Sequence, residues 1–118
     1  MKTFVQEGRT FTAPAPYDRK GGEAALIGNI VAVAVFDVAQ GAEGEWTCEG
    51  IYDLAKAPSQ AWAEIGNVIY WDDENKRFTT VAAGNTLAGA MMATTGNGAD
   101  ETVGRVRLNG AARPAEAA

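Results

Sequence analysis

The sequence predicts a mainly β protein: a small single-domain β-barrel or β-sandwich with one short helix and an extended N-terminal arm. Two observations predict this fold class. Hydrophobic residues recur with a period close to two over most of the chain, which is the spacing of a β-strand. The 118 residues include 14 glycines, which favour turns because glycine accepts positive φ without steric cost. We expect an arm or edge segment over residues 1–23, the barrel over residues 24–110 and a disordered tail over residues 111–118.

The two ends of the chain differ from its middle in composition. Near the N-terminus, Pro14 and Pro16 cannot donate a backbone hydrogen bond, so they are excluded from interior positions of a sheet. This predicts an extended arm or an edge segment. The C-terminal stretch "AARPAEAA" has almost no large apolar side chain, and we therefore expect it to be disordered.

The segment "NIVAVAVFDVA" is apolar on both faces, which is typical of a strand buried on both sides. One face is expected to meet the core, and the other to be covered by a second layer or by a neighbouring subunit. We favour the subunit. The segment "TLAGAMMAT" also lacks a polar face. The residues predicted at a subunit interface are Val31, Val33, Val35, Met91 and Met92.

Two further segments alternate between apolar and polar residues. In "GEWTCEGIYDL" the apolar face includes Cys48, which is expected to be a small buried hydrophobe. In "TVGRVRLN" the pattern places Val106 and Leu108 inward, opposite Arg105 and Arg107. Both segments are predicted to be strands.

One short helix is predicted in "PSQAWAEIG". Ser59 is a candidate N-cap, Trp62 and Ile65 lie three residues apart, and Gly66 can end the helix. We expect one or two turns that bury Trp62 in the core.

The stretch "VIYWDDENKRFTT" contains three consecutive acids, Asp72, Asp73 and Glu74, which are candidate metal ligands or turn residues. A calcium loop beginning at Asp72 needs glycine at its sixth position and glutamate at its twelfth, where this chain has Arg77 and Ala83. The pattern instead predicts a β-hairpin whose polar turn follows the strand that contains Tyr70 and Trp71 on opposite faces.

The composition removes most common catalytic mechanisms. The chain has no histidine and one cysteine, so it cannot form a Ser-His-Asp triad, a Cys-His pair or the usual zinc sites. We therefore predict no enzyme, no catalytic residue, no metal and no cofactor. A net charge of −5 argues against a nucleic-acid partner, and the longest apolar stretch is too short to span a membrane. A carboxylate-based, metal-dependent hydrolase is the alternative function.

The order of several segments resembles small bacteriophage capsid cement, or head decoration, proteins. The segments are "FVQEG", "VFDVAQG", "EGIYDL", "VIYWDDENKRFTT", "GNTLAGA" and "GRVRLNG". The resemblance covers residues 3 to 110 and implies a compact β-barrel that assembles as a homotrimer on the outside of the phage head. It implies two partners, the major capsid protein and other copies of the chain. It also implies that the protein is in the host cytoplasm before assembly and on the capsid exterior of the virion afterwards.

A cement protein of this kind needs a segment that reaches the capsid. We expect that contact at Thr3, Phe4, Val5 and Phe11, because a mobile arm with apolar anchors can become ordered on binding. A tail or neck component of the virion with a similar barrel is a further alternative.

Overall fold

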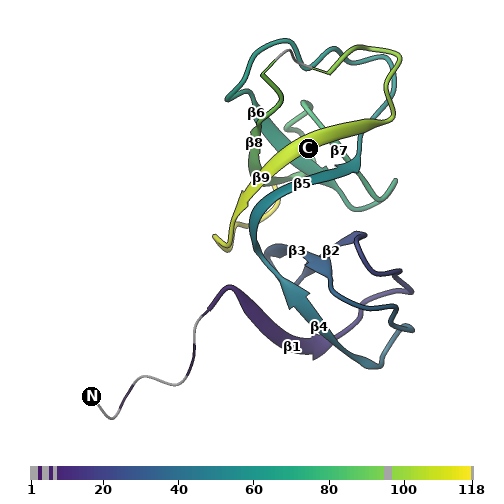
Figure 1. Cartoon of the computed structure of the whole chain (residues 1–118), viewed down its shortest axis with the longest axis vertical. Coiled ribbons are helices and arrows are strands. Elements are labelled where there is room, and N and C mark those ends of the chain that lie inside the picture. Colours follow the sequence, from purple (N-terminus) through teal and green to yellow (C-terminus); the bar gives the residue numbers. More distant parts are fainter. Residues whose placement is uncertain (1–2, 4–5, 7, 95–96, 118) are drawn as a thin grey trace.

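The computed structural model of the chain describes residues 3, 6, 8–94 and 97–117. These residues form nine strands in two antiparallel sheets. Figure 1 shows the two sheets one above the other, joined where the chain runs from β4 into β5. The prediction of a small, mainly β, single-domain protein is confirmed. Across the described ranges there is no helix, and hence none that could cross a membrane.

The first sheet has the strand order β1-β4-β3-β2. Its strands are β1 (Thr10–Pro14), β2 (Ala24–Ile27), β3 (Ile30–Ala34) and β4 (Glu43–Thr47). The β2–β3 hairpin closes through a two-residue turn in which Gly28 has a φ of 64°, a conformation that a glycine adopts without steric strain. Pro14 is the last residue of β1, which is an edge strand. Its missing N–H therefore does not interrupt the backbone hydrogen bonds of an interior strand.

The second sheet has the strand order β5-β9-β8-β6-β7. Its strands are β5 (Glu49–Ala55), β6 (Val68–Asp72), β7 (Arg77–Thr79), β8 (Thr86–Met91) and β9 (Val103–Asn109). A parallel bridge between Lys56 and Phe78 links its two edges, but the edge strands do not pair along their length. The structure is therefore two open sheets, so the barrel, one of the two architectures that the sequence predicted, is wrong.

A single chain segment passes from the first sheet to the second at Cys48. The sequence pattern treats residues 44–54 as one strand, whereas the structure divides them into β4 and β5. Gly50 has a φ of 127° just after the division, which only glycine tolerates easily. The predicted inward face is nevertheless correct, because Trp46, Cys48 and Leu54 are all buried.

The buried residues form two clusters. The main core contains Ala24, Val31, Val33, Leu54, Trp62, Ile69, Trp71, Phe78, Met91, Val106 and Leu108. The small core contains Ala15, Ala25, Ala32, Ala34, Trp46 and Cys48. Successive residues of β3 point to opposite faces, so this strand contributes to both clusters and is buried on both sides, as predicted. Its second face is covered by the chain's own residues, whereas we expected a neighbouring subunit there.

The predicted helix at residues 58–66 is absent. Ser59 has a φ of 63°, whereas a helix N-cap normally has an extended backbone. The backbone N–H groups of Ser59 and Trp62 instead donate to the carbonyls of Ala99 and Asn97, 2.9 and 2.8 Å away. Trp62 is fully buried without a helix because the segment is held as an extended strap beside residues 97–102.

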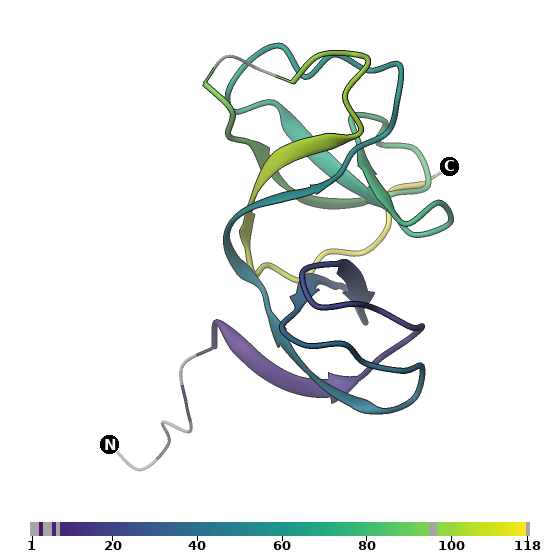
Figure 2. The ribbon, with the colours of Figure 1, turned by 45° about the vertical axis from the view of Figure 1, so that its right-hand side comes forward.

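Both chain ends are more closely attached than the sequence predicts. From Thr10 onward the expected arm is an edge strand, paired with β4 from Thr10–Thr47 to Pro14–Glu43. The C-terminal segment, coloured yellow in Figure 2, leaves β9 and turns back along the molecule. The Arg113 N–H donates to the Asn29 carbonyl at 2.8 Å, and the Glu116 N–H donates to the Asn85 carbonyl at 2.8 Å. Composition alone missed these backbone contacts.

Candidate functional site

The three consecutive acids belong to the β6–β7 hairpin, as predicted. The Asp72 carboxylate accepts hydrogen bonds from the backbone N–H groups of Glu74 and Asn75 at 3.2 Å and from Asn75 Nδ2 at 2.8 Å. An aspartate in this position stabilises a turn by replacing backbone acceptors. Within the ranges that the structure describes, no group of three or more His, Cys, Asp or Glu side chains is placed to hold a metal ion.

Asp73 connects the two sheets. Its Oδ1 accepts a hydrogen bond from the Tyr17 hydroxyl at 2.7 Å and another from Trp71 Nε1 at 3.0 Å. Tyr17 lies in the loop after β1, and the Lys76 ammonium lies 4.2 Å from the centre of its ring. Burial and the hydrogen bond to Asp73 raise the pKa of Tyr17 well above its usual range. Asp72 therefore stabilises the turn of the hairpin, and Asp73 joins the hairpin to the first sheet.

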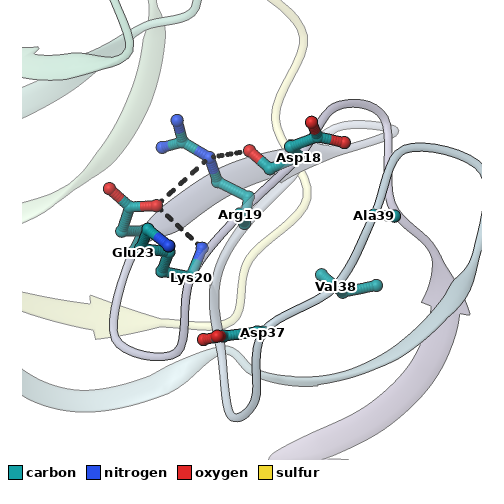
Figure 3. A pocket seen from close by; sticks show the side chains of 7 residues that line it. All are labelled: Asp18, Arg19, Lys20, Glu23, Asp37, Val38 and Ala39. Carbon is teal, nitrogen blue, oxygen red and sulfur yellow. Dashed lines mark hydrogen bonds and ion pairs between the residues drawn. The ribbon is translucent and has the colours of Figure 1, made fainter.

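A hollow of about 470 Å³ lies between the loop after β1 and the β3–β4 connection (Figure 3). Arg19 and Val38 hold these loops together with two backbone hydrogen bonds of 2.9 and 2.8 Å. The carboxylates around the hollow accept backbone hydrogen bonds: Asp18 from Gln40, Asp37 from Gly21 and Glu23 from Lys20. Each of these three acids therefore fixes a loop through a backbone hydrogen bond.

Lys56 is a buried cation that the sequence analysis did not single out. Its side chain is 2% exposed, and Nζ donates to the backbone carbonyls of Ala57 and Glu101 at 3.1 and 3.2 Å. Burial lowers the pKa of Lys56. A lysine with a lowered pKa can act as a nucleophile, but this one is enclosed by carbonyls and lies 5.5 Å from the centre of the Trp62 ring. It therefore serves the packing of the strap.

The side of the second sheet that points away from the main core is here called the outer face. Strand alternation places Ile51, Val68 and Val103 on it, and these side chains are 57%, 51% and 51% exposed. On the same face Arg105 donates to both carboxylate oxygens of Asp53, at 2.9 and 3.2 Å. This hydrogen-bonded guanidinium lowers the pKa of Asp53. Ile51, Val68 and Val103 thus share the outer face, and the charged residues Asp53, Arg105 and Arg107 lie between them.

The sequence matches one protein family, described as phage cement protein, over residues 5–108. The match spans most of the 118 residues. The chain belongs to the phage cement protein family. The resemblance found in the sequence is thereby confirmed. No curated protein and no solved structure matches the chain significantly.

As a phage cement protein, the chain is a structural component of the virion and binds the phage capsid. The fold is consistent with this role, because the two sheets share one core and present an exposed β surface. No feature of the described residues favours the hydrolase alternative: the acids of the hairpin and of the loop hollow hold backbone turns.

The residues predicted at a subunit interface of this cement protein differ in exposure. Val31, Val33 and Met91 are at most 5% exposed and pack in the main core. Val35 is 42% exposed in the connection after β3, and Met92 is half-buried after β8. An interface role remains a prediction, and Val35 and Met92 are the two of these residues that a neighbouring molecule can reach without opening the core.

Two of the four residues predicted to contact the capsid, Thr3 and Phe11, lie within the described part of the chain. Phe4 and Val5 lie outside the described residues, and Thr3 is exposed. Phe11 lies in β1 and packs against the small core, so its side chain is partly occupied by the fold. The contact itself stays a prediction.

Sequence analysis did not identify the Tyr17–Asp73 hydrogen bond or the outer face as a unit. The two partners of the hydrogen bond are 56 positions apart, and no local pattern links them. The outer face had a usable signal, because Ile51 was the apolar exception on a polar strand face and Val103 the exception on the arginine face. The register of β5 and β9 shows that these exceptions lie on the same side of one sheet.

Proposed function

We propose that the protein binds the outer surface of the phage head as a homotrimer, contacts the major capsid protein there, and stabilises the head mechanically. Membership of the phage cement protein family supports the capsid as partner. The outer face supports a binding role, since it leaves Ile51, Val68 and Val103 half exposed on a small chain.

The mechanism is the addition of interface area between capsid subunits. A protein–protein interface of standard size buries about 1,600 Å² in total, and many copies on one head act together. The protein is expected to be present in the host cytoplasm before assembly and on the capsid exterior afterwards. In the trimer, Val35 and Met92 are the candidate subunit contacts, and Thr3, Phe4 and Val5 are candidate capsid contacts.

Binding to heads tests this function directly. Heads of the phage that encodes the protein, prepared without it, are mixed with the purified chain and sedimented. We expect saturable co-sedimentation and an increase in the temperature at which the heads release their DNA. Gold labelling of the protein on intact virions should mark the head, whereas a labelled tail or neck would contradict the proposal.

The oligomeric state is a separate measurement. Light scattering at increasing concentration should give three times the mass of the 12.4 kDa chain. A chain that stays monomeric both in solution and on the head would contradict the homotrimer while leaving head binding intact.

A further inference from the structure

One row of side chains crosses four strands of the outer face. The register places Ile51 opposite Arg107, Arg107 opposite Ala90, and Ala90 opposite Val68. Directly opposed residues on neighbouring strands point to the same side of a sheet. Strands lie about 4.8 Å apart, so these four positions span about 14 Å. The row therefore has an apolar side chain at each end and a guanidinium between them.

Two hollows flank Arg107 along this row. One, of about 220 Å³, is formed because β8 presents the small residues Ala88, Gly89 and Ala90 between Val68 and Arg107. The other is shallower, about 650 Å³, and lies on the far side of Arg107 next to Ile51 and Glu49. An extended segment laid across the row would find a place for a side chain on either side of the guanidinium.

The charge around the hollows is opposite to that of the whole chain. They are lined by three arginines, Arg9, Arg107 and Arg113, and by one acid, Glu49, for a local balance of 3 − 1 = +2. The chain as a whole has a net charge of −5. A cationic site on an acidic protein attracts an anionic partner and repels cationic ones.

Arg105 and Arg107 differ in whether their charge is already neutralised. Arg105 is held by Asp53 with two hydrogen bonds. Among the described residues, no carboxylate forms an ion pair with Arg107. Arg107 thus retains donors for a carboxylate of another molecule, and a guanidinium binds a carboxylate through two parallel hydrogen bonds.

We propose that the row of Ile51, Arg107, Ala90 and Val68 docks an extended acidic segment of the capsid surface. A carboxylate of that segment binds the Arg107 guanidinium, and the side chains two residues before and after it, which share its face of the extended segment, enter the two hollows. This inference rests on the proposed function, because head binding supplies the partner. It adds the site and the chemistry that the site recognises: one carboxylate between small apolar side chains.

Two matched pairs of variants test the proposal in the head co-sedimentation assay. Arg107→Gln removes the cation without an ion-pair partner, and Arg105→Gln removes the neutralised cation two residues away on the same face. Val68→Ser removes one apolar end of the row, and Val81→Ser makes the same change at an equally exposed valine (51%) outside the second sheet. Thermal unfolding of all four variants is measured to check that each one folds.

Arg107→Gln is expected to weaken head binding about tenfold or more, since an interfacial ion pair is lost. Val68→Ser should weaken binding severalfold, and the two control variants should bind like the unaltered protein. Binding of the unaltered protein should also weaken with added NaCl, and Arg107→Gln should reduce this salt dependence.

Other outcomes distinguish the inference from the function beneath it. If the unaltered protein binds heads and Arg107→Gln binds equally well, the proposed row is wrong and the head-binding function stands. If all four variants weaken binding to the same extent, the row has no special role. If Arg107→Gln abolishes self-association instead, the occupant is a second copy and the capsid assignment is overturned. If the unaltered protein does not bind heads, the proposed function itself fails.

Discussion

The Tyr17 hydroxyl lies 2.7 Å from Asp73 Oδ1 and joins the loop after β1 to the hairpin of the second sheet. The same carboxylate oxygen accepts Trp71 Nε1 at 3.0 Å, and Trp71 is buried in the main core. A displacement of the first sheet therefore acts on a side chain that is anchored within the second. Such a connection fits the mechanical stabilisation of the head that we propose for this protein.

Breaking this connection should destabilise the fold. We expect Tyr17→Phe and Asp73→Ala each to lower the free energy of unfolding by about 1–2 kcal/mol, because the first change removes the donor of this hydrogen bond and the second removes its acceptor. Denaturant unfolding of the two single variants and the double variant should give a coupling energy of about 1 kcal/mol. Tyr70→Phe is the control, since no described residue forms a hydrogen bond with the Tyr70 hydroxyl. Strictly additive effects would contradict the connection.

Stability should fall at alkaline pH through Tyr17. Its raised pKa means that the folded protein retains the phenol proton where the unfolded chain releases it, above a pH of about 10. The contribution is complete below pH 10 and is lost as pH rises beyond it. Unfolding free energies between pH 9 and 11.5 should fall more steeply for the unaltered protein than for Tyr17→Phe. Equal slopes for the two proteins would show that Tyr17 is not involved.

The packing of the strap on β9 should not tolerate a side chain at Gly104. An added Cβ there would lie 2.1 Å from Cζ3 of the fully buried Trp62. Gly104→Ala is expected to lower the free energy of unfolding by about 2–3 kcal/mol, as in other overpacked cores. Gly98→Ala is a matched control, because a Cβ at Gly98 meets nothing within 4 Å. Similar thermal unfolding of both variants would contradict this packing.

The two parts of the N-terminal segment should behave differently. Removing residues 1–8 leaves β1 complete, so we expect little change in the unfolding temperature. Phe11→Ala should lower the free energy of unfolding by about 2 kcal/mol, because Phe11 packs against the small core. If Thr3, Phe4 and Val5 contact the capsid, the truncated protein will also bind heads more weakly than the full chain. Unchanged head binding would remove the arm from the proposed function.

The thiol of Cys48 should be unreactive in the folded protein. Its side chain is 4% exposed, and burial with the nearby Glu49 carboxylate raises its pKa. A thiol reagent at pH 8 is expected to react at the rate of unfolding and immediately in denaturant. Because the chain has one cysteine, the measurement reports on this residue alone. Fast reaction of the native protein would show that the small core opens readily.

The local pattern of the sequence predicts much of the second sheet. Alternation, broken only at Val103, identified β9 with Val106 and Leu108 inward, and the polar run after Trp71 identified the β6–β7 hairpin. Both depend on side-chain period and turn chemistry, which act over a few residues. The same local reasoning failed at Ser59, because helix signals there were outweighed by backbone hydrogen bonds to a distant loop.

The sequence by itself determined that the chain is mainly β and that β3 is buried on both faces. It also excluded histidine-dependent catalysis and identified the family as phage cement proteins. The tertiary structure alone decided which residues cover β3, how Tyr17 reaches Asp73, and that Ile51, Arg107 and Val68 lie in one row. The preference of a side chain for burial and the period of the hydrophobic pattern are local properties of the chain. Register and the stacking of sheets depend on contacts between residues far apart in sequence, for which no local signal exists.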